Sequence, residues 1–393
     1  MRVSRLELFD FRNYERLRLE PGPGLNLLIG PNAQGKSNLL EAFYALATTK
    51  SLRAGRDSEM VRFGAEACRI VTEVDRQTTG DVLLEMAIGA ANAALSVGER
   101  KVVKINHGRH AKIADLIGNL NVVLFSSYDL AIVRGEPDER RRFLNYEIAQ
   151  VSPRYVVALA SYRRALEQRN RLLKDARWGH ADTATLDAWS AQIVEHGARL
   201  IERRRDYLDK LAVHARDLHR QLSDGAETLL VEYGPSFPLA HAVTVEEVAA
   251  RFTDALSQVR RDEMQRGTTL LGPQRDDVCF RVGPSPEAAV DVKTFGSQGQ
   301  QRTVALSLRL AERRLIEEMV GEPPVVLLDD VLSDLDERRR AQVFALALGP
   351  TGGQTFLTTT DLNALPAEAR QQAAVWSVRA GAVTPYEATG AAA

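Results

Sequence analysis

The stretch LNLLIGPNAQGKSNLLEAFYAL, residues 25–46, joins a strand pattern to a helix pattern through a glycine-containing turn. Leu25–Ile29 is a mainly apolar run of the kind that forms a buried strand. Ser37–Ala47 has apolar residues at helical spacing. The turn between them matches the pattern GxxxxGK[ST] in the context that this pattern requires, with a strand before it and a helix after it. The stretch therefore predicts an α/β fold with a phosphate-binding loop.

The residue types of this loop suit a nucleotide. Glycines let the backbone wrap a phosphate chain, and N–H groups at the start of the helix point at the anion. Lys36 is expected to reach the β- and γ-phosphates, and the Ser37 hydroxyl to ligate Mg²⁺. The alternative is a glycine-rich turn with a chance Lys-Ser pair. The candidate ligands of ATP in this loop are Gly30, Asn32, Gly35, Lys36, Ser37 and Asn38.

A second apolar run, Val325–Leu328, ends in two carboxylates. Open parallel sheets bind ligands at the carboxyl ends of their strands, so these side chains are expected beside the loop. Asp329 is the candidate that holds Mg²⁺ through water. Asp330 is the candidate catalytic residue that polarises the attacking water, and Lys36 is the second catalytic candidate. Taken alone, the run equally fits a buried strand that ends in an acidic turn.

Two further patterns flank the acidic strand. Ser297-Gln-Gly-Gln precedes an amphipathic helical stretch, and Ser333-Asp-Leu-Asp follows the strand. Each is weak alone, because the first also fits a flexible loop and the second an ordinary helix cap. The four patterns in this order resemble the motif set of ABC-type ATPases. That resemblance implies a two-fold homodimer, in which ATP lies between the phosphate loop of one subunit and the signature residues Ser297, Gly299 and Gln300 of a second copy.

The middle of the chain, residues 138–266, is rich in Arg, Glu, Ala and Leu at helical spacing. Within it, Arg154–Ala176 and Thr183–Leu222 predict helices of about 35 Å and about 60 Å, at 1.5 Å per residue. The predicted organisation is one α/β ATPase head formed by residues 1–125 and 276–393, with residues 126–275 inserted as a helical arm. Three consecutive small domains are the alternative.

Composition limits the classes of partner. Lys and Arg number 51 against 52 Asp and Glu, a net charge of −1, so any nucleic-acid surface must be local. The 2 cysteines lie far apart and outside any CxxC pattern, which disfavours a disulfide framework and suits a cytoplasmic protein. No apolar run approaches the roughly 18 residues of a membrane span. We therefore expect a cytoplasmic protein without a membrane partner.

The chain as a whole resembles the RecF family of bacterial recombination mediators, over about residues 1–362. The matching segments are LELFDFRNY, the phosphate loop through Arg53, FSSYDLAIVRGEPDERRRFLN, LLGPQRDD and LLDDVLSDLD. The resemblance implies a slow DNA-dependent ATPase that dimerises with ATP and binds double- and single-stranded DNA at gaps. It also implies that RecR and RecO are partners, and that RecA is loaded onto the gap, in replication restart, recombination and the SOS response.

Three features depart from these patterns and leave alternatives open. Gln274 stands where the RecF stretch commonly has histidine, and Thr358–Thr360 occupy the place of the switch histidine of many ABC ATPases. Asp330 replaces the usual glutamate and is one methylene shorter, so the attacking water could be poorly placed. A nucleotide-gated scaffold with negligible hydrolysis is therefore one alternative. A transporter's nucleotide-binding subunit is another, although the missing histidine and the large insertion argue against it.

Local positive charge supplies the candidate DNA contacts, and Arg53, Arg56, Arg141 and Arg163 are the four selected here. Arg53 has a second expected role at the nucleotide. Phosphate contacts need only positive charge gathered on one face. The alternative is that arginines beside Glu and Asp form a solvated helix face with i,i+4 pairs. The wider set of basic candidates is Lys50, Lys101, Lys104, Arg140, Arg142, Arg164, Arg169, Arg171 and Arg203–Arg205.

Overall fold

The computed structural model describes residues 1–90, 100–108, 112–177, 183–331, 337–349, 352–362, 365 and 367–386. The chain forms two compact units, which are described separately below. Unit 1 combines residues 1–129 with residues 309–393, and unit 2 comprises residues 130–308. The second boundary falls inside helix α9 (Gln298–Val320), which therefore belongs partly to each unit.

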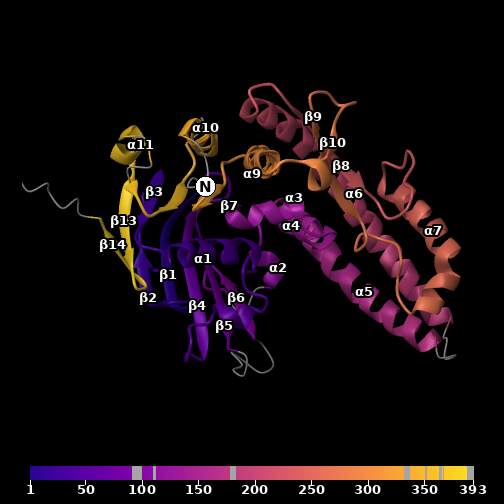
Figure 1. Cartoon of the computed structure of the whole chain (residues 1–393). Helices are drawn as coiled ribbons and strands as arrows, with labels where there is room; N and C mark the ends of the chain where they lie inside the picture. The colour runs from indigo at the N-terminus through magenta and orange to yellow at the C-terminus, as the bar shows by residue number, and fades with distance from the viewer. Residues whose placement is uncertain are drawn as a thin grey trace, which may run out of the picture. The chain divides into compact units, whose positions relative to one another are not determined.

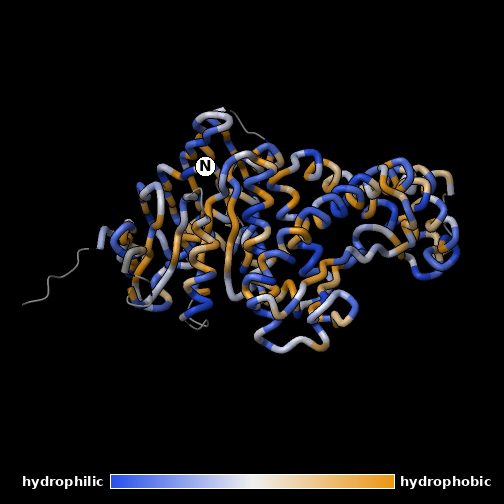
Figure 2. Tube along the Cα trace, turned by 90° about the horizontal axis from the view of Figure 1, so that it is seen from above, coloured by the Kyte–Doolittle hydropathy of each residue, from blue (hydrophilic) through white to orange (hydrophobic). Residues whose placement is uncertain are grey.

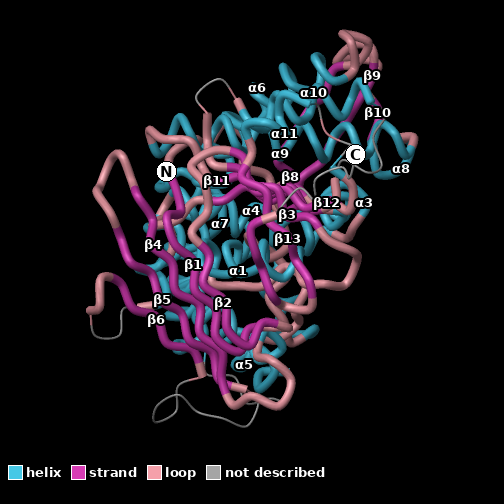
Figure 3. The backbone as a smooth tube through the Cα atoms, turned by 90° about the vertical axis from the view of Figure 1, so that its left-hand side faces the viewer, coloured by secondary structure: helices cyan, strands magenta, loops and turns pink. Residues whose placement is uncertain are grey.

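Unit 1 contains two β-sheets. The strands of the first are β1 (Arg2–Phe11), β2 (Tyr14–Leu19), β4 (Ala67–Asp75), β5 (Val82–Gly89) and β6 (Lys101–Ile105). The strands of the second are β3 (Leu25–Ile29), β7 (Val122–Phe125), β11 (Val325–Asp329), β12 (Thr355–Thr359), β13 (Ala374–Arg379) and β14 (Ala382–Pro385). The first sheet is antiparallel in the order β2-β1-β4-β5-β6, and its strands lie side by side in Figure 3.

The second sheet has the order β14-β13-β3-β12-β11-β7. Its strands from β13 to β7 are parallel, and β14 pairs antiparallel with β13. Strands β3, β11 and β7 each read as a buried run because a parallel sheet covered on both faces excludes water from every side chain. Strand β12 lies between β3 and β11, so the ends of these three strands meet at one edge of the sheet.

Helix α1 (Lys36–Thr48) packs between the two sheets of unit 1 (Figure 1). It contacts β5 of the first sheet and β7, β11 and β12 of the second, and most of its residues are buried. Phe43 stacks at a tilt on Phe356 of β12, with ring centroids 4.5 Å apart. The other helices in the described part of unit 1 are α2 (Ile113–Leu116), α10 (Glu337–Leu348) and α11 (Ala367–Gln372), with 3₁₀ turns at Asp57–Met60 and Ser127–Asp129.

Unit 2 is mainly helical. Its helices, besides α9, are α3 (Leu130–Arg134), α4 (Pro137–Val151), α5 (Pro153–Arg177), α6 (Thr183–Leu222), α7 (Val245–Arg266) and α8 (Val292–Phe295). Helices α5, α6 and α7 pack against one another, and we call these three the arm. Gly197 of α6 lets them approach, because a Cβ there would lie 2.7 Å from Phe252 and 3.0 Å from Tyr162. Hydrophobic and hydrophilic residues alternate along these helices (Figure 2), as expected of amphipathic helices.

The structure differs from the sequence predictions in two places. Strand β8 (Thr228–Gly234) interrupts the segment predicted as helical, and it pairs with β9 (Asp277–Gly283), which also pairs with β10 (Val290–Asp291). The prediction was wrong here because the partner strand lies far along the chain. The compact units also divide at 129/130 and 308/309 rather than at 125/126 and 275/276, so the signature residues belong to unit 2. The functional division into an ATPase head (residues 1–125 and 276–393) and an inserted helical subdomain (residues 126–275) stays a prediction.

One predicted pattern, Ser333–Asp336 after the acidic strand, lies outside the described part of the chain. In the part that the structure describes, no helix is both long and apolar enough to cross a membrane.

Candidate nucleotide-binding site

The phosphate loop lies between β3 and α1, and two of its glycines are required by close approaches. Gly35 has φ 114°, a left-handed conformation that disfavours a side chain. A Cβ at Gly35 would lie 2.6 Å from the Asn13 side chain and 3.0 Å from the Tyr14 hydroxyl. A Cβ at Gly30 would lie 2.2 Å from the carbonyl oxygen of Val378 on β13. The motif predicts phosphate binding for both glycines, and the structure shows that packing of the loop requires them as well.

Lys36 points back over the loop that precedes it. Its ammonium group donates to the carbonyl oxygens of Gly30 at 2.5 Å and Pro31 at 2.8 Å. Burial lowers the pKa of Lys36, and the nearby carboxylates of Asp330 and Asp329 act in the opposite direction. A cation held by two carbonyl oxygens at the opening of a helix is placed to exchange these contacts for phosphate oxygens.

The predicted metal ligands meet although they are distant in sequence. The Ser37 hydroxyl donates to Asp329 Oδ1 at 2.7 Å, and the Thr358 hydroxyl donates to the same oxygen at 3.0 Å. Thr358 also accepts from the backbone N–H of Asp330 at 3.0 Å. Thr358 reaches Asp329 and Asp330 because its strand, β12, lies next to β11 in the sheet, between β11 and β3. A hydroxyl and a carboxylate side by side provide the oxygen ligands that Mg²⁺ takes together with waters and substrate phosphates.

A cleft of about 270 Å³ opens at this edge of the sheet. Asp330, in a left-handed conformation with φ 53°, lies at its wall. The candidates Asn32, Gly35, Lys36, Ser37 and Asn38 line it, together with Arg53, Asp330 and Thr358–Thr360. The structure thus brings together the candidates from the phosphate loop and the acidic strand. The size and the lining of this cleft suit the phosphate end of a nucleotide.

The turn between β1 and β2 supports the phosphate loop, a contact that was not predicted from the sequence. Asn13 donates to the carbonyl oxygen of Gln34 at 3.0 Å and accepts from Asn38 at 2.7 Å. The Tyr14 hydroxyl donates to the carbonyl oxygen of Gly35 at 2.9 Å. Burial raises the pKa of Tyr14 well above its usual value, so the phenol stays protonated and keeps this bond. The adjacent Asn-Tyr pair in a turn was the available signal, but only the fold places it at the loop.

Glu41 on α1 holds Arg53 at the edge of the cleft, a second feature that sequence reasoning missed. Arg53 donates to Glu41 at 2.6 Å and to the Asn38 side chain at 2.8 Å. Glu41 is buried and also accepts from Arg12 at 2.7 Å and from Ser51. Burial alone would raise the pKa of Glu41, but the bonds from Arg12 and Ser51 and the charge of Arg53 lower it below the usual value. This geometry favours the nucleotide-side role considered for Arg53 over a DNA contact.

The signature residues lie in unit 2 and form the start of α9. The Ser297 hydroxyl accepts from the N–H of Gln300 at 3.2 Å, and the Gln300 side chain accepts from the N–H of Ser297 at 2.8 Å. This reciprocal pair is a capping box, so Ser297 caps the helix that follows it. Ser297 and Gly299 are exposed, while Gln300 also donates to Glu227 at 2.7 Å. Exposure leaves both small residues accessible to a second molecule.

The basic candidates separate into buried and exposed groups. Arg169 is 2% exposed and is paired with the buried Glu263 at 2.6 Å, so its consideration as a DNA contact was wrong. Arg140 and Arg204 are likewise inward, bonded to Asp277 and to the carbonyl oxygen of Pro273. Lys101, 8% exposed, pairs with Asp57 at 2.6 Å. Position in a run of arginines therefore does not predict exposure.

Among the four candidate arginines, Arg53, Arg56 and Arg163 are exposed. Arg141 donates to the carbonyl oxygen of Asp276 at 2.7 Å and is 17% exposed in its side chain. Arg141 and Arg163 line one cleft of about 470 Å³ in unit 2, which Gln274 also lines. Gln274 accepts from the buried Tyr162 hydroxyl, so an amide satisfies the position that commonly carries an imidazole.

Three comparisons with known proteins agree on the family to which this chain is similar. The sequence signature of the family described as RecF/RecN/SMC N terminal domain matches residues 2–384. The DNA replication and repair protein RecF of Oceanobacillus iheyensis is 38% identical over 384 residues, which cover 98% of this chain and 100% of that protein. The solved structure of the recombination mediator protein RecF-ATPrS in the RecFOR pathway is 29% identical, with a TM-score of 0.86 over 98% of each chain.

A solved SmcHead bound to the C-winged helix domain of ScpA, 14% identical with a TM-score of 0.55 over 99% of this chain and 98% of that one, supports the fold alone. Together these matches confirm the predicted fold class, an ABC-type P-loop ATPase head with an inserted helical subdomain. They exclude the alternative that the chain is the nucleotide-binding subunit of a transporter. The chain belongs to the RecF/RecN/SMC N-terminal-domain family and, within it, to the RecF proteins.

Proposed function

We propose that this chain is a DNA-dependent ATPase that dimerises when ATP is bound and clamps DNA at single-strand gaps and at junctions of double- and single-stranded DNA. In this role it helps RecO and RecR to load RecA, and so supports replication restart, recombination and the SOS response in the cytoplasm. Similarity to RecF proteins over the whole chain supports the repair role. The observation that carries the nucleotide part is the contact between Ser37 and Asp329 beside Lys36.

The residues of the cleft have separate roles in this proposal. Lys36 binds the β- and γ-phosphates, and the N–H groups of the loop bind the remaining phosphate oxygens. Ser37 and Asp329 are the residues that would hold Mg²⁺, which when bound with the nucleotide neutralises phosphate charge. Asp330, which also lines the cleft, orients the attacking water. Thr358 fixes the carboxylate of Asp329 and the backbone of Asp330 through its two hydrogen bonds.

Hydrolysis is expected to be slow. Thr358–Thr360 line the cleft in place of a switch histidine, and none of the described residues that line it offers an imidazole to sense the γ-phosphate. Asp330 reaches one methylene less far than glutamate, which weakens the placement of the water. The same observations support the second candidate, a nucleotide-gated scaffold with negligible hydrolysis. The two candidates share ATP-dependent dimerisation and differ only in turnover.

Dimerisation in this proposal depends on unit 2. Ser297 and Gly299 are exposed at the start of α9, and small exposed residues at a helix start can approach an anion closely. They would contact the γ-phosphate of ATP bound to a second copy. DNA contacts are assigned first to Arg56 and Arg163, which are exposed, and then to Arg141, which shares a cleft with Arg163.

The first test is the mass of the protein in solution with ATP, with ADP, and with ATP plus gapped duplex DNA. A dimer that forms only with ATP and persists longer on gapped DNA is the expected result. A monomer in all three states would contradict the clamp, even if nucleotide still binds. Measuring the rate of phosphate release on gapped DNA then separates the slow ATPase from the scaffold.

Three variants assign the residues. Lys36→Ala is expected to lose ATP binding and turnover, and Ser297→Arg to bind ATP without dimerising. Asp330→Asn is expected to abolish turnover while prolonging the ATP-bound dimer, because ATP still closes the interface but is not removed. Normal turnover in Asp330→Asn would remove the assigned role of this carboxylate. An ATP-induced dimer in Ser297→Arg would remove Ser297 from the composite site.

A further inference from the structure

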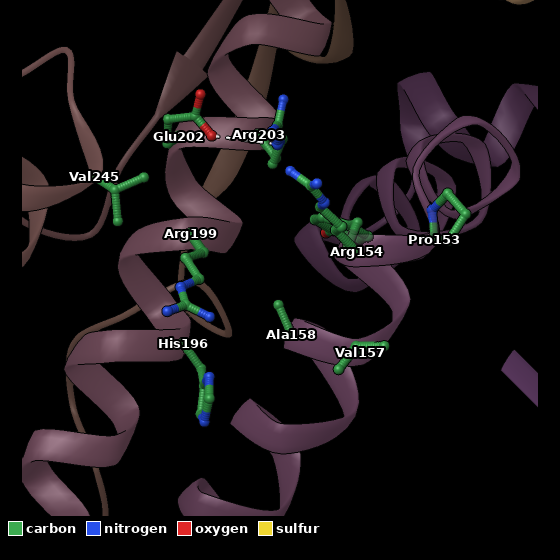
Figure 4. Close-up of a pocket in the computed structure, with 10 residues that line it drawn as sticks. Pro153, Arg154, Val157, Ala158, His196, Arg199, Glu202, Arg203 and Val245 are labelled. Atoms are coloured by element: carbon green, nitrogen blue, oxygen red, sulfur yellow. Dashed lines mark ion pairs between the residues drawn. The ribbon is translucent and has the colours of Figure 1, made fainter. Parts of the chain in front are cut away.

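A cleft of about 530 Å³ in the arm has no role in the proposed ATPase. It is lined by the first two turns of α5, the middle of α6 and the start of α7. Figure 4 shows Arg154 extending from α5 toward α6, which carries Arg199 and Arg203. Its volume lies within the roughly 300–1,000 Å³ of ligand-binding clefts.

Three guanidinium groups face this cleft against one carboxylate, Glu202. Arg203 pairs with Glu202 at 3.5 Å, the dashed contact in Figure 4, and Arg199 pairs with Glu195 on its own helix at 3.0 Å. The arginine side chains of these pairs are 44% and 54% exposed, and exposed pairs are readily exchanged for a better anion. Within the described residues, the side chain of Arg154 has no ion-pair partner.

Apolar side chains lie between these charges. Val157 on α5 is 60% exposed, and Ala158 and Val245 also line the cleft. Val243, two residues before Val245, is 67% exposed. Arginine is enriched at protein–protein interfaces, where Lys, Glu and Asp are depleted. The cleft thus offers bidentate donors for carboxylates and an apolar lining for one hydrophobic side chain.

We propose that this cleft binds an acidic segment of a partner protein in which an apolar side chain is flanked by carboxylates. The carboxylates would pair with Arg154 and Arg203, and the apolar side chain would cover Val157. A nucleic-acid strand fits less well for two reasons. Its phosphates have no apolar group to place on Val157, and the aromatic residue of the lining, Tyr155, is 1% exposed and offers no ring face for stacking bases.

The test uses the full-length protein and a fluorescein-labelled heptapeptide, Asp-Glu-Asp-Leu-Asp-Glu-Asp, with fluorescence anisotropy as the readout. Saturable binding is expected, and it should weaken when serine replaces leucine in the peptide. The double variant Arg154→Glu/Arg203→Glu should weaken binding by about tenfold or more, since two attractive contacts become repulsive. Val157→Ser should weaken binding of the leucine peptide but not that of the serine peptide.

Arg171→Glu is the control, because it makes the Arg-to-Glu change of one of the two substitutions at an exposed position of α5 about 25 Å further along the helix. It should leave peptide binding unchanged, and circular dichroism should show that every variant keeps its helix content. Absence of saturable binding up to about 1 mM peptide would overturn the inference. So would equal weakening by Arg171→Glu, which would indicate attraction to the whole arm.

A competing single-stranded oligonucleotide identifies the other possible occupant. Displacement of the peptide by the oligonucleotide, with oligonucleotide binding lost in Arg154→Glu/Arg203→Glu, would assign the cleft to nucleic acid and overturn the inference. The measurement needs neither ATP nor gapped DNA. Failure of the proposed clamp function would therefore leave this result unaffected, and the reverse also holds.

Discussion

Replacing Glu322 with glutamine removes a negative charge from the interior of unit 1 without changing the size of the side chain. The Glu322 carboxylate is 0% exposed and lies 3.0 Å from the α-ammonium group of Met1. It also accepts from the Arg76 guanidinium at 2.9 Å, the Gln77 N–H at 3.1 Å and the Thr78 hydroxyl at 2.9 Å. These contacts connect the residues that follow β4 to the segment that precedes β11, so the Glu322 carboxylate links the two sheets.

The contacts give a magnitude for the loss. Burial alone would raise the pKa of Glu322, but the bonds from Arg76, the α-ammonium group and the turn lower it from 4.5 to about 2. A difference of about 2.5 pKa units corresponds to about 3 kcal/mol of stability at pH 7. Because the folded-state pKa lies below the unfolded value, this stability is present above pH 4.5 and is lost as the pH falls toward 2. At pH 3 about 1 kcal/mol would remain.

The assay is thermal unfolding of wild type and Glu322→Gln by calorimetry, followed by urea unfolding at a series of pH values. At pH 7 the transition of unit 1 is expected to fall by about 6–12 °C, from about 2–4 °C per kcal/mol for domains of this size. Glu20→Gln is the matched control, since the Arg18–Glu20 pair is more than 60% exposed on both sides and should contribute almost nothing. A Glu322→Gln transition as high as that of the control would refute the reasoning. So would a difference from wild type that stays constant between pH 7 and pH 3.

Three further substitutions test other parts of the structure. Gly35→Ala places a Cβ against Asn13 at a left-handed φ, so ATP affinity should fall and stability drop by about 1–3 kcal/mol; unchanged titration with a fluorescent ATP analogue would contradict this. Arg169→Met leaves the carboxylate of Glu263 buried without its cation, so the free energy of unfolding in urea should fall by about 3–5 kcal/mol. Arg171→Met, at an exposed position, should not lower it. Thr358→Val should lower ATP turnover while ATP still binds, because Asp329 loses a donor; wild-type turnover would show that this bond is dispensable.

The sequence alone determined the elements whose signals are local. The predicted helix Thr183–Leu222 has the bounds of α6, and the predicted strand Leu25–Ile29 has the bounds of β3. Long helical periodicity and short apolar runs between turns need no partner to be recognised. The candidate loop residues Lys36 and Ser37 were identifiable for the same reason, since the pattern that contains them is contiguous. The adjacent carboxylates of Asp329 and Asp330 could be predicted because they follow a buried run directly.

Only the tertiary structure decided which distant residues meet. Strand β8 pairs with β9, and the local sequence of Thr228–Gly234 does not predict that pairing. Thr358 reaches Asp329 because β12 inserts between β3 and β11, a strand order set by packing of the whole sheet. Arg169 turns inward because Glu263, 94 residues away, lies opposite it. The physical reason is the same in each case. A buried charge or a strand edge is stable only with its partner, and folding of the chain, rather than any local pattern, brings that partner into contact.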